Sequence, residues 1–141
     1  METRKEQKEK RRQEILCAAL ELFVSRGYAA TKITDIAAQA NMSTGLMFHY
    51  FESKEKLYEE LIRMGVEATA YTKKKKCKHA IDFFVQFTTQ LFAYMKEHPV
   101  TAKMFVLMAQ AQRSEATPEH IRKIALQVNT IEQFVPIVEW G

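Results

Sequence analysis

Three hydroxyl side chains stand at the beginnings of predicted helices, where they could take part in phosphate binding. Thr31, Ser43 and Ser53 each precede a stretch in which apolar residues recur at helical spacing. A hydroxyl at a helix start accepts hydrogen bonds from the amides of the first turn, and exposed amides at that end attract phosphate. The pattern is therefore typical of a phosphate-binding surface. It is equally typical of plain helix caps, and the residue types alone leave both interpretations open.

The residue patterns that catalysis requires are not recognisable in this sequence. It has no nucleophile with a neighbouring base, no carboxylate pair, no glycine-rich phosphate loop and no cluster of metal-ligating residues. His49 has no His or Cys at ligand spacing, and Cys17 and Cys77 stand far apart. We therefore expect no enzyme, no metal and no cofactor.

The elements that must position these side chains are all helices. With 4 glycines and 3 prolines, the chain has too few turn residues for a β protein, and the sequence predicts an all-α fold. We find no strand. The helices are expected over residues 5–26, 32–39, 44–51, 54 to the region of 71–78, 79–97 and 100–112, with a seventh beginning near residue 118.

The second and third predicted helices form a helix-turn-helix arrangement, because only about three residues separate them. Asn41, in this turn, is one of the few residue types that tolerates a positive φ. Thr31 is expected to cap the second helix and Ser43 the third. Ile36, Phe51 and Leu57 are expected in the core.

The chain's charge does not single out a nucleic-acid face. The net charge is +4, and it divides equally between residues 1–57 and 58–141. Basic residues cluster at 4–12 and at 73–78, but most such runs are solvated surface. The sequence has no apolar run long enough to span a membrane, no signal peptide and no disulfide framework, so we expect a cytoplasmic protein.

Residues 15–57 resemble the N-terminal DNA-binding domain of the TetR (tetracycline-repressor-like) family of bacterial transcription regulators. No single element of the match is specific, but the ordered set is. The residues that carry the resemblance are Ile15-Leu16, Ala18-Ala19, Leu22-Phe23, Gly27-Tyr28, Thr31, Asp35-Ile36-Ala37, Ala40, Ser43, Gly45, Phe48, Tyr50-Phe51, Ser53-Lys54-Glu55 and Leu57.

The resemblance implies a helix-turn-helix domain over residues 1–53 whose third helix enters the major groove of double-stranded DNA. It assigns phosphate or base contacts to Thr31, Lys32, Ser43, Thr44, Gly45, His49, Tyr50 and Lys54. Asn41 departs from the family's usual glycine, and Phe48 departs from a frequent tyrosine. Leu46 and Met47 make this helix unusually apolar, so base recognition is expected to rely on few hydrogen bonds or on thymine methyl groups.

For residues 54–141 the resemblance implies a helical effector domain, with the helix from residue 54 as connector. It predicts a repressor that binds a palindromic operator as a homodimer and is released by a small apolar or amphipathic molecule. Candidate pocket residues are Tyr71, Phe84, Phe87, Thr88, Leu91, Met95, Met104 and Met108. These residues are equally typical of ordinary core. The alternative is a DNA-binding module whose second half, including the aromatic segment 81–95, binds another protein and no small effector.

The family pattern continues for about two further long helices that pair two subunits. The effector domain therefore looks truncated, because the sequence stops near the point where those helices would begin. The segment 79–97 is apolar on nearly every side and is expected to be a buried helix. Later apolar residues are expected to leave a surface that only the missing helices would cover: Ile121, Ile124, Val128, Ile131, Val135, Ile137, Val138 and Trp140. We therefore expect self-association through helices six and seven, or a fragment of a longer dimeric protein.

Overall fold

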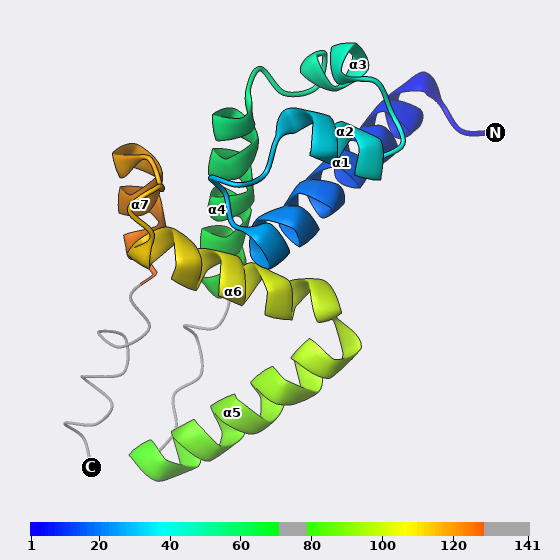
Figure 1. The fold of residues 1–141 in the computed structure, drawn as a ribbon. Helices are drawn as coiled ribbons and strands as arrows, with labels where there is room; N and C mark the ends of the chain where they lie inside the picture. Colours follow the sequence, from blue (N-terminus) through cyan, green and yellow to red (C-terminus); the bar gives the residue numbers. More distant parts are fainter. Residues whose placement is uncertain (71–78, 129–141) are drawn as a thin grey trace.

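The computed structural model describes residues 1–70 and 79–128, and the side chains of residues 1–68 and 79–128. The described residues form seven helices and no strand, which confirms the all-α expectation (Figure 1). The helices are α1 (Arg4–Arg26), α2 (Ile33–Gln39), α3 (Thr44–Phe48), α4 (Lys54–Ala70), α5 (Ala80–Glu97), α6 (Pro99–Arg113) and α7 (Glu119–Leu126). None of them is long and apolar enough to cross a membrane.

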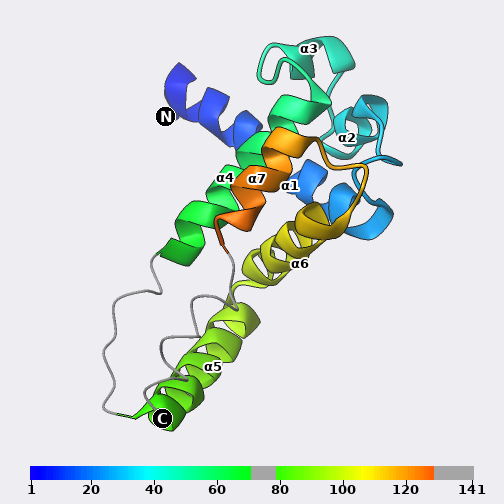
Figure 2. The same ribbon diagram turned by 90° about the vertical axis from the view of Figure 1, so that its left-hand side faces the viewer.

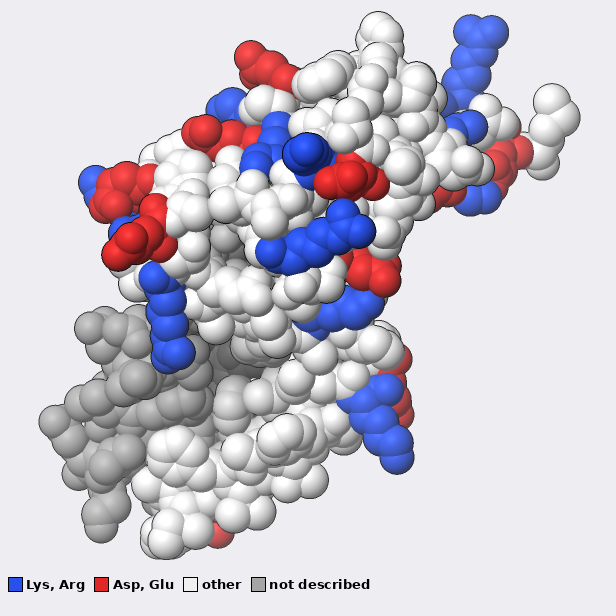
Figure 3. Space-filling view, viewed as in Figure 1, with Lys and Arg blue, Asp and Glu red and all other residues white. Residues whose placement is uncertain are grey.

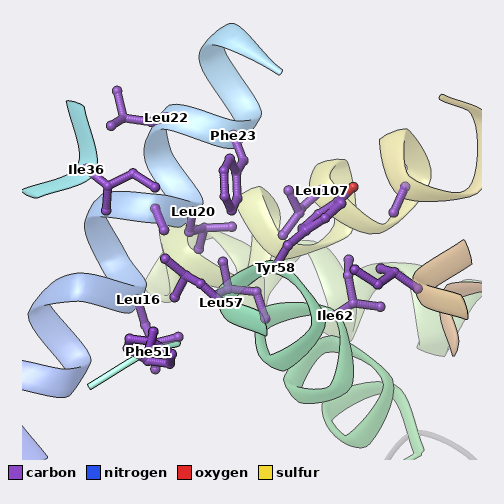
Figure 4. Packing of buried hydrophobic residues seen from close by; sticks show 14 of the residues in the cluster. Leu16, Leu20, Leu22, Phe23, Ile36, Phe51, Leu57, Tyr58, Ile62 and Leu107 are labelled. Carbon is purple, nitrogen blue, oxygen red and sulfur yellow. The ribbon is translucent and has the colours of Figure 1, made fainter. Parts of the chain in front are cut away.

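One hydrophobic core joins the helix-turn-helix to the helices that follow it. Ile15, Phe23 and their neighbours on α1 pack with Ile36 of α2 and with Leu57 and Tyr58 of α4. The same cluster includes Leu107 of α6 and extends into α7, so the core does not divide at the boundary predicted at residue 53 (Figure 4). The three core residues expected from the sequence, Ile36, Phe51 and Leu57, are all buried.

The connections of the helix-turn-helix have the backbone geometry that the sequence predicts. Gly27 ends α1 with a φ of +87°, and its amide donates a hydrogen bond to the Phe23 carbonyl. Asn41 has a φ of +55°, the only positive φ of a non-glycine residue among the described residues. A side chain is strained in that conformation, and asparagine tolerates the strain better than most residues.

The expectation that residues 79–97 form a buried helix is wrong. Helix α5 forms, but Ile81 is 76% exposed and Phe92 is 67% exposed. Its main packing partner is α6, and in Figures 1 and 2 it lies at the end of the molecule opposite α3. Apolar composition signals a tendency to be buried, but burial also requires neighbouring elements on every side, which the described helices do not supply.

The apolar side of α7 is not left uncovered, contrary to expectation. Ile121, Ile124 and Val128 are buried, because α7 packs against both α4 and α6. The amide of Gln112 on α6 donates hydrogen bonds to the carbonyls of Ala125 and Val128, which holds the end of this helix in place. The remaining apolar residues predicted for this surface, from Ile131 to Trp140, lie outside the described residues.

Helices α4 and α6 cross closely at a glycine. A Cβ atom built on Gly65 would lie 2.5 Å from the sulfur of Met108 and 3.2 Å from Cγ of Met104. Real Cβ atoms do not make a contact of 2.5 Å, so a larger residue at this position would force the Met108 side chain to move. Two of the methionines predicted to line a pocket are therefore packed against the α4 backbone.

Candidate nucleic-acid interface

Helix α3 presents the residues expected to approach base edges. Ser43 caps it, and its hydroxyl accepts a hydrogen bond of 3.1 Å from the amide of Leu46, as predicted. Thr44 and Gly45 follow in the first turn, and a Cβ atom on Gly45 would meet no atom within 4 Å. Met47 is fully buried and anchors the helix to the core. The start of α3 is thus fixed to the body of the protein while its outer side remains open.

The outer side of α3 is apolar and exposed. Leu46 is 37% exposed and Phe48 is 50% exposed, an arrangement that suits contacts with thymine methyl groups. The helix ends at Phe48, three residues earlier than the sequence predicts, and His49 follows as its exposed C-terminal cap. Tyr50 is half-buried against the core. His49 and Tyr50, to which the resemblance assigns phosphate contacts, therefore lie in the turn after α3 rather than on the helix.

Thr31 does not cap α2, in contrast to the prediction. Helix α2 begins after Lys32, whose amide donates a hydrogen bond of 3.1 Å to the Asp35 carboxylate. The Thr31 side chain is 1% exposed, and its hydroxyl donates to the carbonyls of Gly27 and Leu22. This hydroxyl closes the connection after α1 and is turned away from solvent. Lys32, which is exposed, is the residue at this corner that can reach a phosphate.

Lys54, at the start of α4, is held by the connection between α1 and α2. Its ammonium group donates hydrogen bonds of 2.9 Å to the Tyr28 carbonyl and 3.2 Å to the Thr31 carbonyl. It also lies 4.2 Å from the centre of the Tyr28 ring. Burial lowers the pKa of Lys54 from its ordinary value, because desolvation disfavours the charged form. Ser53 caps α4 as predicted, through a hydrogen bond from the Lys56 amide.

An aromatic contact that was not predicted from the sequence lies beneath this ammonium group. The rings of Tyr28 and Tyr58 stack with centroids 4.3 Å apart, and Phe23 meets Tyr58 edge-on at 5.2 Å. Burial is the main cause that raises the pKa of both tyrosines, so both hydroxyls remain neutral. Tyr58 lies on the apolar side of α4, so its burial could have been predicted from the helical pattern. Its pairing with a residue thirty positions earlier is a tertiary contact that no local pattern reveals.

The helix-turn-helix carries no positive side chain of its own. Between Lys32 and Lys54 the sequence has no Lys or Arg, and it has two acidic residues, Asp35 and Glu52. In Figure 3 the lobe at the top centre, where α3 lies, is formed by uncharged residues. Binding to DNA depends strongly on neutralising phosphates with Lys and Arg. That charge must therefore come from outside the α2–α3 unit.

The described residues among those proposed to line an effector pocket lie on two helices, α5 and α6. Tyr71 lies outside the described residues, and Thr88 is exposed, with its hydroxyl donating to the Phe84 carbonyl. Met104 and Met108 pack on Gly65, as described above. The other four are half-buried along one side of α5: Phe84, Phe87, Leu91 and Met95. The described residues thus bring four of the eight together on one helix.

The helix-turn-helix region matches a known family. Residues 15–61 match the family model described as bacterial regulatory proteins, tetR family. This N-terminal region, one third of the chain, is therefore similar to the TetR family. The match includes α2, α3 and the first half of α4, so the resemblance inferred from the sequence is confirmed.

Curated proteins to which this chain is similar are named transcription regulators. Over 53 residues this chain is 43% identical to the transcriptional repressor KstR2 of Mycolicibacterium smegmatis. This alignment covers 38% of this chain and 26% of KstR2. Over 84 residues this chain is 34% identical to the transcriptional regulator HbdR of Aromatoleum sp., covering 52% of this chain and 36% of that protein. The chain therefore aligns with about a quarter to a third of these relatives' lengths.

The similarity of fold extends beyond the helix-turn-helix. The structure of the ketosteroid transcriptional regulator KstR2 of Mycobacterium tuberculosis superposes with a TM-score of 0.69 at 24% identity. This superposition covers 93% of this chain and 67% of the other protein. The arrangement of helices after α3 is thus also of the TetR type, although the sequence likeness there is low.

Proposed function

We propose that this chain is a DNA-binding transcription regulator of the TetR type, most simply a repressor. The observation that carries the proposal is the start of α3. There a capped and anchored helix leaves Thr44 and Gly45 open to the outside, within a region that matches the family's DNA-binding model. A helix fixed in this way can place its first turn in a major groove. The expected partner is double-stranded DNA, with a palindromic operator bound by two copies of the protein.

Selection of binding sites from a randomised duplex library tests this function. We expect enrichment of one sequence motif with the 141-residue chain, and a loss of that enrichment with Leu46→Glu. A carboxylate on the outer side of α3 would face the phosphates and repel them. Leu126→Glu is the matched control, because Leu126 is also exposed but lies on α7. The proposal would be contradicted if the unaltered chain retains no duplex. It would also be contradicted if Leu46→Glu and Leu126→Glu reduce the enrichment equally.

We further propose that a small apolar or amphipathic molecule releases the DNA by binding beside α5. The support is the half-buried stripe of Phe84, Phe87 and Leu91, in which aromatic and aliphatic side chains lie next to one another at helical spacing. Phe83 and Phe87 stack with centroids 5.9 Å apart, so part of this side is already ordered. The protein is proposed to have two conformations that differ in the orientation of α4 and α5. A molecule that binds one conformation better shifts the population toward it.

The effector proposal is tested by thermal unfolding with apolar compounds. A ketosteroid and a long-chain fatty acid are suitable probes, since a structurally similar regulator is described as a ketosteroid regulator. A ligand at a hundred times its Kd stabilises the folded state by about 2.7 kcal/mol. We expect this shift to be absent in Phe87→Ala and kept in Phe92→Ala, which lies on an exposed side of the same helix. A compound that stabilises both variants equally would show that it binds elsewhere.

A protein partner in place of a small effector is the second candidate, and the exposed side of α5 favours it. Ile81, Val85 and Phe92 lie on one face of the helix, and all three are exposed large apolar side chains. Exposed apolar surface of this kind often marks an interaction site. This function would be supported if no probe compound shifts unfolding and if Ile81→Gln with Phe92→Gln changes the sedimentation coefficient.

A further inference from the structure

The first part of α1 extends beyond the core as a charged helix. Residues 4–14, which we call the α1 overhang, contain no apolar residue, and none of them is buried. At 1.5 Å per residue the overhang is about 16 Å long. A capping box orders its start, in which the Thr3 hydroxyl and the Glu6 carboxylate each accept a hydrogen bond from the other residue's amide. The overhang is thus a capped helix that the core does not require.

The overhang is one of the two basic clusters of the sequence, the other being residues 73–78. Residues 4–14 contain six Lys or Arg and three Glu, a net charge of +3. Two of the three acidic residues are engaged locally: Glu6 in the capping box, and Glu9 with the Gln13 amide. Among the described residues Arg4, Lys5, Lys8 and Arg11 have no ion-pair partner.

Other basic residues of the overhang have different roles. Arg12 forms an ion pair with Glu60 of α4 and lies 5.3 Å from the centre of the Phe51 ring, so it holds α1 against the body. Lys10 lies 3.9 Å from Glu2. Within the described part of the chain, the four cations without an ion pair are therefore the part of the cluster that is available to an external anion.

The overhang lies at the same end of the molecule as α3. Figures 1 and 2, which differ by a rotation about the vertical axis, both place α3 and the beginning of α1 at the top. At helical spacing Arg4, Lys8 and Arg11 share the side of α1 that continues into the buried Ile15. Arg11 also lines an open groove with Asn41, in the turn before α3. On this side of the overhang, Arg11 thus lies beside the turn of the helix-turn-helix.

Because α2 and α3 carry no cation, we propose that the α1 overhang supplies the charge that binds the DNA backbone beside α3. The inference rests on the proposed function. Arg4, Lys5, Lys8 and Arg11 would contact phosphates that flank the bases read by α3. Such contacts strengthen binding to every sequence alike and fix the position of the protein on the duplex. They also make the affinity strongly dependent on salt concentration, since each neutralised phosphate releases counterions.

The test compares two sets of four substitutions that remove the same charge. One set changes Arg4, Lys5, Lys8 and Arg11 to Gln. The control set changes four exposed cations on α5, α6 and α7 to Gln, namely Lys96, Lys103, Arg113 and Lys123. The probe is a labelled random-sequence duplex of about thirty base pairs, and its Kd is measured over a range of salt concentrations. Circular dichroism confirms that each variant keeps its helices.

For the overhang set we expect the slope of log K against log salt to fall by up to about 3.6, at about 0.9 for each phosphate that is no longer neutralised. For the control set we expect a change well below this. An unchanged slope in the overhang set, or equal changes in the two sets, would overturn the inference and leave the proposed function standing. An unaltered chain that binds no duplex even at low salt would refute both.

Discussion

The ammonium group of Lys54 donates a hydrogen bond of 2.9 Å to the backbone carbonyl of Tyr28. The two residues belong to different elements, since Tyr28 follows α1 and Lys54 begins α4. With a second bond to the Thr31 carbonyl, the lysine joins the connector helix to the corner from which α2 starts. If α4 moves relative to α2, either these hydrogen bonds break or the connection before α2 moves together with α4. The same side chain has one N–H donor left with which to reach a phosphate.

Replacing Lys54 by Met should lower both stability and DNA affinity. Methionine keeps an unbranched stem and removes the donors, so the free energy of unfolding should fall by about 1–2 kcal/mol, measured by denaturant titration. If the third donor contacts a phosphate, affinity for all sequences should fall alike, and the salt slope should decrease by about one. Lys56→Met is the control, because Lys56 is exposed and pairs only with Glu59 at 3.6 Å among the described residues. If Lys54→Met loses stability but its salt slope is unchanged, Lys54 stabilises the fold and does not contact a phosphate.

Replacing the two helical glycines by Ala should give opposite results. Gly45→Ala meets open space, so helix propensity should leave the protein equally stable or more stable, by up to about 1 kcal/mol. Its DNA affinity should fall, because the added methyl group holds α3 away from the groove. Gly65→Ala should lower the melting temperature, since its Cβ would meet the Met108 sulfur at 2.5 Å. A destabilised Gly45→Ala protein would show that this glycine serves the fold.

Replacing Thr44 should change which base is preferred at one position of the site. Thr44 is the first residue of α3, where its hydroxyl and methyl groups can meet a base edge. For Thr44→Ala we expect a loss of about 1–3 kcal/mol for the preferred base at that position, and little change at the others. Competition binding with duplexes that differ at single positions measures this. A uniform loss across all positions would assign Thr44 to the backbone instead.

Glu59 should stabilise the protein only above acidic pH. A hydrogen bond from Arg63 holds the pKa of Glu59 below its usual range, with further help from the charges of Lys56, Arg63 and His120 against the opposing effect of burial. A carboxyl group whose pKa is lower in the folded state contributes stability above its unfolded pKa, and this contribution disappears as pH falls through the folded value.

Thermal unfolding of Glu59→Gln at several pH values measures this contribution. The variant should melt below the unaltered protein at pH 7, and the difference should shrink as pH falls below 4.5. Glu67→Gln, an exposed position on the same helix, should show no such dependence. A difference between Glu59→Gln and the unaltered protein that persists unchanged at pH 3 would mean that Gln loses packing rather than charge.

Local features of the fold were determined by the sequence itself. The helices, the Gly27 and Asn41 turns, and the Ser43 and Ser53 caps depend on residues within a few positions of one another, so their signals are local. The order of small, apolar and hydroxyl residues over one third of the chain was enough to indicate the TetR family. The cation-free stretch between Lys32 and Lys54 is also visible in the sequence, although its meaning depends on where other charges lie.

Tertiary structure alone decided which surfaces face inward and which cations are free. The pattern of α5 predicts burial, yet α5 is largely exposed because, among the described helices, α6 is its main packing partner; α7 is buried because two helices cover it. Thr31 and Lys54 both carry groups suited to phosphate, but carbonyls brought close by the fold bind the hydroxyl and two donors of the ammonium. Burial and pairing depend on neighbours distant in the sequence, whereas helix formation and capping depend on neighbours along the chain.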